Sequence, residues 1–255
     1  MELEPYEPIG VEVTKMSLRR LRWDQIPVLK GALAKHGVAV FPGQHLDDDA
    51  LVALLQQLGT LIFTTGETPV AGYPDLNVIS NVGRTVPPSS NFHVDSSYLS
   101  RPPIYTALRA VHIPSRGGQT LFTNQYLAYE RLPVDMVSRL QGRLVTHVVT
   151  GLDLGEEDET SAEHPLFSSH PISNRTALYL STPARCVAVS GMGPQESAEV
   201  VQYLYEHSTR EDNVFRHSWA PGDVVIWDNR CVMHKADHTG VVGDRVMHRG
   251  MVTNA

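Results

Sequence analysis

The segment from residue 91 to residue 98, NFHVDSSY, contains a histidine and an aspartate that are two positions apart. In an extended segment, residues i and i+2 point to the same side, so His93 and Asp95 can reach one common point while Val94 packs behind them. An imidazole and a carboxylate are both ligands for transition metals. The pair therefore predicts half of a metal site, although a His-x-Asp pattern also occurs by chance in a hydrogen-bonded surface pair.

A further histidine follows a buried-looking strand near the C-terminus, in the segment WDNRCVMHK (227–235). With His234, the chain offers two imidazoles and one carboxylate. This set leaves one side of an octahedron open and suits non-haem Fe(II) and dioxygen chemistry. Zinc is the main alternative, because ligand type alone does not exclude it. Trp227 and the polar residues 228–230 are expected to anchor and support His234.

Two arginines near the end of the chain predict a binding site for an anion. Arg245 and Arg249 are four residues apart, so in a strand both face the same side, toward the metal. The turn at residues 117–118 is followed by Thr120, whose hydroxyl can share the carboxylate of a bound anion with Arg245. The alternative is that both arginines lie at the surface or in ion pairs.

Length and charge limit the class of protein. The 255 residues are 42% hydrophobic and 19% charged, an ordinary globular composition with enough apolar material for one core. The net charge of −7 and the lack of a Lys/Arg cluster argue against a nucleic-acid partner. Neither a signal peptide nor a membrane span is evident, so we expect a cytoplasmic protein with reduced cysteines. A small molecule is the expected partner, and the sequence leaves a homo-oligomer open.

Two helical patterns lie near the start of a chain that is otherwise rich in strand patterns. Residues 24–36 and 47–58 place leucines at helical spacing. Strand-like runs occur at residues 38–41, 76–80, 105–111, 144–149, 177–180, 224–227 and 245–252, and further helical stretches occur around 125–141 and 194–207. This order favours a mainly β fold with peripheral helices, in the form of a two-sheet barrel or jelly roll.

One domain over residues 1–255 is the expected organisation, since single domains often reach this length. The acidic run DLGEEDETSAE (153–163) is typical of a solvated, mobile loop. Long irregular segments between strands often serve as lids or binding loops. We therefore expect this loop to cover a bound substrate.

The order and spacing of many segments resemble the TauD/TfdA family of Fe(II)- and 2-oxoglutarate-dependent dioxygenases. The resemblance covers most of the chain and is carried by HGVAVFPGQ (36–44), NFHVDSSY (91–98), RPP (101–103), GGQTLFTN (117–124), HP (164–165), SSHPISNRTALYLS (168–181), PQESAEVV (194–201), SWAPGDVVIWDNRCVMHKAD (218–237) and DRVMHR (244–249). It implies a double-stranded β-helix core, which agrees with the jelly roll expected from the strand pattern.

The resemblance also implies the roles of particular residues. His93, Asp95 and His234 would bind Fe(II), and Thr120 and Arg245 would hold the distal carboxylate of 2-oxoglutarate. Arg249 would lie near the metal-bound end of 2-oxoglutarate and near the substrate. A second cation at this place predicts that the substrate is anionic.

The activity implied by the resemblance uses O2 and 2-oxoglutarate to hydroxylate a small organic substrate, or to cleave it after hydroxylation, with release of succinate and CO2. Asn91 and Tyr98 are candidate substrate-binding residues. Where the sulfonate-using branch has a histidine, this chain has Thr64 and Thr65, so taurine is not the expected substrate. The DSSY segment (95–98) is closer to the aryloxyalkanoate branch.

Two other functions stay open. A catalytically silent sensor of iron or 2-oxoglutarate would keep the same ligands, whereas a zinc hydrolase would need a general base and no 2-oxoglutarate site. Thr120 and Arg245 therefore count against the hydrolase. Asp95 counts against a halogenase, in which a small residue replaces the carboxylate.

Overall fold

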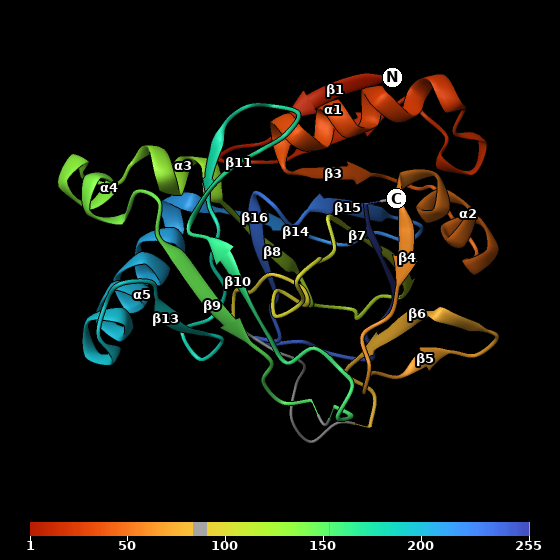
Figure 1. Cartoon of the computed structure of the whole chain (residues 1–255). Helices are drawn as coiled ribbons and strands as arrows, with labels where there is room; N and C mark the ends of the chain where they lie inside the picture. Colours follow the sequence, from red (N-terminus) through yellow and green to blue (C-terminus); the bar gives the residue numbers. More distant parts are fainter. Residues whose placement is uncertain (84–90, 153, 255) are drawn as a thin grey trace.

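The largest element of the protein is a nine-stranded sheet (Figure 1). The structure is a computed structural model and describes residues 1–83, 91–152 and 154–254. The strand order is β1-β2-β3-β15-β7-β17-β6-β5, and β4 also pairs with β17. The strands are β1 (Glu2–Pro5), β2 (Val11–Thr14), β3 (Val38–Phe41), β4 (Thr60–Ile62), β5 (Pro69–Val70), β6 (Tyr73–Ser80), β7 (Tyr105–His112), β15 (Val224–Asp228) and β17 (Val246–Thr253).

A three-stranded sheet packs against this sheet and completes the jelly roll. Its strands, in spatial order, are β14 (Val214–His217), β8 (Thr120–Asn124) and β16 (Val232–Ala236). Alternate residues of the large sheet, among them Val38, Val40 and Val225, form one core with Phe122 and Val232 of the small sheet. The predicted mainly β fold is confirmed, and the residues between the two sheets are those that can line an internal site.

Two N-terminal helices cover the outer face of the large sheet. They are α1 (Ile26–His36) and α2 (Asp48–Leu58), which lie at the top and right of Figure 1. Leu33 and Leu54 belong to the same core cluster as Phe41, whose side chain points away from the small sheet. Because the helices cover one face of β3 and β15 and the small sheet covers the other, every residue of these two strands is buried.

The remaining helices gather on the opposite side of the molecule with a third sheet. They are α3 (Gln125–Glu130), α4 (Val134–Leu140) and α5 (Pro194–Ser208). The sheet has the order β10 (Ser161–Pro165), β9 (Leu144–Val148) and β13 (Cys186–Val189), and β11 (Phe167–Ser169) pairs with β12 (Thr176–Leu178) beside it. Leu140, Leu166 and Leu204 are buried in the core that these elements share.

Local chemistry explains where the predicted helices begin and end. The Asp47 carboxylate accepts a hydrogen bond from the Ala50 amide at 2.9 Å and caps α2, and Gly37 ends α1 with a φ of 68°. The helical stretch predicted around 125–141 forms two helices, α3 and α4, with Pro133 between them. Proline has no amide hydrogen and disfavours helical backbone in the residue before it, so it starts a new helix and does not continue the old one.

The last residues of the acidic segment 153–163, which was predicted to be a loop throughout, form a strand. Residues Ser161–Pro165 form β10, which pairs with β9. Asp153 lies outside the described residues. Glu159 accepts hydrogen bonds from the amide and the hydroxyl of Ser100, at 2.6 and 2.8 Å. The mobility of the loop stays a prediction.

Two further expectations concern the membrane and the cysteines. Within the described ranges, no helix has both the length and the apolar character needed to cross a membrane. Cys186 and Cys231 are buried and are not bonded to each other.

Candidate active site

The three predicted metal ligands lie together although His234 is distant in sequence from the other two. His93 and His234 form an antiparallel bridge in which the amide of each residue donates to the carbonyl of the other, at 3.0 and 2.9 Å. Their imidazole rings are therefore neighbours, with centroids 4.4 Å apart. The His-x-Asp segment is not part of a regular strand as predicted, because the chain turns at Ser96, which has a φ of 41°. Asp95 nevertheless faces the same point as His93.

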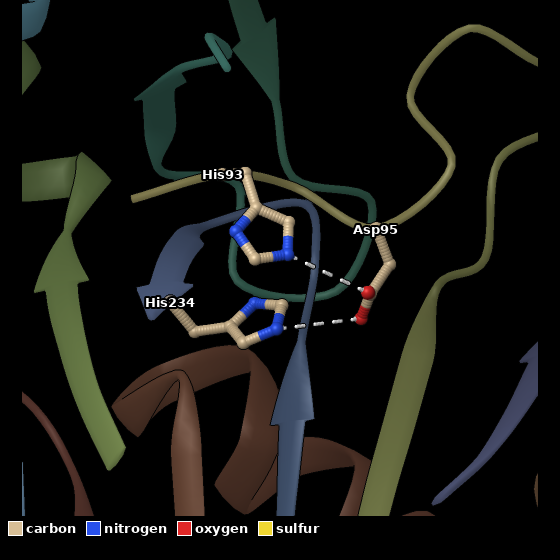
Figure 2. A group of neighbouring side chains, drawn as sticks. All are labelled: His93, Asp95 and His234. Carbon is tan, nitrogen blue, oxygen red and sulfur yellow. Dashed lines mark ion pairs between the residues drawn. The ribbon is translucent and has the colours of Figure 1, made fainter. Parts of the chain in front are cut away.

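Figure 2 shows one ring nitrogen of each histidine directed at the Asp95 carboxylate. Nε2 of His93 lies 4.0 Å from Oδ1 of Asp95, and Nε2 of His234 lies 3.8 Å from Oδ2. These distances are too long for hydrogen bonds, but one ligand atom from each residue lies within 4.8 Å of the other two. Nδ1 of His93 is 2.9 Å from the Asn91 carbonyl, so Nε2 is the nitrogen free to bind a metal. The donor set fits a divalent cation.

Two strands of the large sheet hold the Asp95 carboxylate. The hydroxyl of Thr106, in β7, donates to Oδ2 at 2.8 Å, and Nη1 of Arg249, in β17, donates to Oδ1 at 2.9 Å. Asn229 donates to the Thr106 hydroxyl at 2.8 Å, and the Trp227 indole donates to Asn229 at 3.1 Å. These bonds fix the direction of the carboxylate from both sides.

This arrangement corrects the predicted role of residues 228–230. Asn229 supports Asp95 through Thr106 and not His234, while Asp228 binds His170 and Arg230. Trp227 is the residue that contacts His234, with ring centroids 4.5 Å apart. The sequence could not separate these roles, because the partner strand β7 is far away along the chain.

The surroundings keep the three ligands in their metal-binding forms. Burial lowers the pKa of His93 and lowers the pKa of His234 to about 3. Burial alone would raise the pKa of Asp95, but the neighbouring His234 and Arg249 and the hydrogen bond from Thr106 hold it well below its usual value. At neutral pH the site therefore presents two neutral imidazoles and one carboxylate, which are the forms that bind metal.

A pH prediction follows from these lowered pKa values. The affinity for Mn(II), used as a redox-stable probe, should be nearly constant between pH 7 and pH 8, because neither histidine must lose a proton to bind. Affinity should fall only well below the ordinary histidine pKa of about 6.5, because burial lowers the pKa of both histidines. Calorimetric titration in two buffers of different ionisation enthalpy measures the protons released at pH 7. Release of about one proton per Mn(II) would contradict the expectation.

Thr106→Val should weaken metal binding by about 10- to 100-fold, the usual effect of losing a hydrogen bond that orients a ligand. Valine has nearly the same shape but cannot donate to Asp95 or accept from Asn229. Mn(II) titration measures the loss, and circular dichroism checks the fold. Thr209→Val is the control, because that hydroxyl donates to the Tyr205 carbonyl at the end of α5. Equal affinities in the two variants would show that Thr106 does not position the ligand.

The metal ligands line a cavity of about 390 Å³ that also contains the predicted anion-binding residues. Arg245 donates from Nε to the Gly118 carbonyl at 2.9 Å and from Nη2 to the Thr120 hydroxyl at 3.1 Å. The Trp219 indole also donates to this hydroxyl, at 3.0 Å. Burial lowers the pKa of Arg245 to about 10, and no carboxylate of the described residues contacts its guanidinium. Such a cation needs an anionic ligand.

Arg249 also faces the cavity, but its charge already has two partners. One nitrogen binds Asp95, and the other donates to Glu67 at 2.5 Å. Tyr98 is buried and lines the cavity as well. Asn91 is exposed; its carbonyl contacts His93, and its side chain is not among the described groups that line the cavity.

Comparison with known proteins identifies the family. The model of the family described as "Taurine catabolism dioxygenase TauD, TfdA family" matches residues 2–251. The chain belongs to the TauD/TfdA family of dioxygenases. It is therefore an oxidoreductase.

Curated and solved TauD/TfdA proteins are similar to the chain over nearly its full length. The α-ketoglutarate-dependent 2,4-dichlorophenoxyacetate dioxygenase of Cupriavidus pinatubonensis is 30% identical, with 97% of this chain and 94% of that protein covered. The α-ketoglutarate-dependent sulfate ester dioxygenase of Pseudomonas putida is 28% identical, with 89% and 81% covered. The crystal structure of a taurine dioxygenase from Burkholderia xenovorans is 31% identical, with a TM-score of 0.86 and 100% and 91% covered.

Three residues of the TauD/TfdA cavity were missed in the sequence. Thr106 contacts the site through Asp95, whereas Glu67, which binds Arg249, and Arg185 line the cavity directly. Thr106 is a polar residue inside the predicted strand 105–111, and this was the only signal that the sequence offered for it. Glu67 and Arg185 lie in segments with no periodic pattern, so no local signal distinguished them.

Proposed function

We propose that this chain is an Fe(II)- and 2-oxoglutarate-dependent dioxygenase that hydroxylates a small anionic organic molecule, or cleaves it after hydroxylation, with release of succinate and CO2. The main support is that a two-histidine, one-carboxylate set shares one cavity with the buried pair Arg245 and Thr120. The curated relatives named above act on 2,4-dichlorophenoxyacetate and on sulfate esters, which are anionic. Their names support the substrate class and leave the substrate itself open.

Each group has a separate task in this proposal. His93, Asp95 and His234 hold the metal, which together with 2-oxoglutarate and O2 supplies the oxidising power for hydroxylation. Arg245 pairs with the distal carboxylate of 2-oxoglutarate, and the Thr120 hydroxyl donates to the same carboxylate. Buried apolar walls around these groups exclude water and strengthen the ion pair.

The charges in the cavity argue against a zinc hydrolase. Such an enzyme needs a carboxylate or imidazole that is free to accept a proton from water. Among the described residues that line the cavity, Glu67 is the carboxylate other than Asp95, and its oxygen is bound to Arg249. A zinc hydrolase would also leave the buried guanidinium of Arg245 without an anionic ligand.

Anaerobic titration of the Fe(II)-loaded protein with 2-oxoglutarate tests the proposal. A metal-to-ligand charge-transfer band in the visible is expected, and no band is expected for the zinc-loaded protein. Succinate release in air is then scored for aryloxyacetates, alkyl sulfates and alkyl sulfonates. A charge-transfer band without succinate release on any compound of this panel would favour a sensor. The absence of the band would contradict 2-oxoglutarate binding at the metal.

A further inference from the structure

Three arginines of the described residues line the cavity, and their charges are compensated to different degrees. Arg249 is bound to Asp95 and Glu67, so its charge is compensated within the protein. Arg245 has no carboxylate partner among the described residues, and the proposed function assigns 2-oxoglutarate to it. Arg185 is the third cation that lines the cavity, and none of the described carboxylates forms an ion pair with it. A partly buried cation of this kind calls for an anion from outside the protein.

A hydrogen bond to Thr150 orients the guanidinium of Arg185. Nε donates to the Thr150 hydroxyl at 3.0 Å. The backbone on either side is also fixed, because the Arg185 carbonyl accepts from the Val148 amide at 2.8 Å and its amide donates to Thr182 at 2.9 Å. With Nε engaged, the two terminal nitrogens have no hydrogen bond within the described chain. These nitrogens form the fork that pairs with a carboxylate or a sulfur oxyanion.

Arg185 lies close to the metal ligands but comes from another part of the fold than Arg245. It directly precedes β13 in the third sheet, beside α5, whereas Arg245 directly precedes β17 in the large sheet. Arg185 lines the same cavity as His93, Asp95 and His234. Arg185 and Arg245 therefore offer two candidate anion-binding groups that come from different sheets.

We propose that Arg185, and not Arg249, binds the anionic group of the substrate. The inference rests on the proposed function and extends it to the kind of substrate. Val78, Ile79, Leu108 and Leu152 supply apolar wall to the same cavity. A small molecule with one carboxylate or sulfate group and an apolar body matches this combination of an oriented cation and apolar surface.

Direct binding tests the inference without turnover. Mn(II)-loaded protein, with and without the 2-oxoglutarate analogue N-oxalylglycine, is titrated calorimetrically with phenoxyacetate, hexyl sulfate and the neutral phenoxyacetamide. Arg185→Gln should weaken binding of the preferred anion by roughly 10- to 100-fold and change binding of the amide by less than about threefold. Arg185→Lys, which keeps the charge but loses the fork, should show a smaller loss. Arg216→Gln is the matched control, because that arginine is partly exposed and paired with Glu211.

The outcomes separate this inference from the proposed function. Wild-type protein that binds neither anion more tightly than the amide overturns the inference, as does an equal loss for anion and amide in Arg185→Gln. A loss of N-oxalylglycine affinity in Arg185→Gln with anion binding unchanged would also overturn it, by assigning Arg185 to the co-substrate. Failure of the wild type to bind N-oxalylglycine would instead count against the proposed function, while the Arg185 effect is still scored in the titrations without it. If Arg185→Gln loses affinity for phenoxyacetate, the substrate's anionic group is a carboxylate. If it loses affinity for hexyl sulfate, the group is a sulfate.

Discussion

His234→Ala should reduce succinate release to background and remove metal binding, because a site with three protein ligands has no spare donor. The same result is expected for His93→Ala and Asp95→Ala. Succinate release measures the loss of activity, and metal analysis after gel filtration measures the loss of binding. Among substitutions in the site, these are expected to cause the largest losses of activity.

The fold should survive the change at His234. Its bridge to His93 is made by backbone atoms, and Nδ1 of its ring has no hydrogen-bond partner among the described residues. The substitution therefore removes packing against Trp227 but breaks no protein hydrogen bond, and the cost in unfolding free energy should be about 1–3 kcal/mol. Circular dichroism and thermal melting check this.

His112→Ala is the control for a histidine substitution in the same fold. His112 lies at the exposed end of β7, and its loss should leave both metal content and succinate release unchanged. The assignment of the three ligands fails if His234→Ala protein still couples 2-oxoglutarate decarboxylation to substrate oxidation at near the wild-type rate.

Arg245→Ala should raise the dissociation constant for 2-oxoglutarate by roughly ten- to a hundredfold or more, since charge-assisted hydrogen bonds contribute about 1.5–3 kcal/mol each. The structure gives the reason: the guanidinium is buried, is held by Gly118 and Thr120, and lacks a carboxylate partner in the described chain. Arg245→Lys should recover little, because an ammonium cannot reproduce the planar pair of donors. Anaerobic titration of the Fe(II) protein, followed in the visible, measures the constant.

Thermal melting gives a second measurement of the same effect. Saturating 2-oxoglutarate should raise the melting temperature of the wild type clearly and that of Arg245→Ala much less, because a ligand stabilises a protein according to its affinity for the folded state. Arg216→Ala, a partly exposed arginine paired with Glu211, should behave like the wild type in both measurements. An unchanged dependence on 2-oxoglutarate in Arg245→Ala would place the co-substrate's carboxylate at another residue.

The sequence by itself determined the features that depend on near neighbours. The two-residue spacing of His93 and Asp95 brings them to one side, and the four-residue spacing of Arg245 and Arg249 does the same along β17. Leucines at helical spacing determined α1 and α2. In each case the information lies within a few residues, because backbone geometry repeats over that distance.

The sequence pattern was weaker where strands are buried on both faces. All five residues of β8 are buried, so its residues show no alternation of apolar and polar character, and β8 was not predicted. β16 was also not predicted as a separate strand: three of its five residues are buried, and it carries His234 inside the strand and not after one. Motif resemblance supplied the roles that periodicity could not.

Only the tertiary structure decided which distant groups share the cavity. The pairing of β16 with the segment at His93, and the position of β7 beside β17, determine that Thr106 and Arg249 hold Asp95. The fold also places Glu67 beside Arg249, whereas Arg185 lines the cavity without a carboxylate partner among the described residues. Such contacts depend on strand register and on how sheets pack, and a shift of one residue in register would turn every side chain to the other face. No local pattern contains that information, and so the balance of charges in the cavity could be read only from the folded chain.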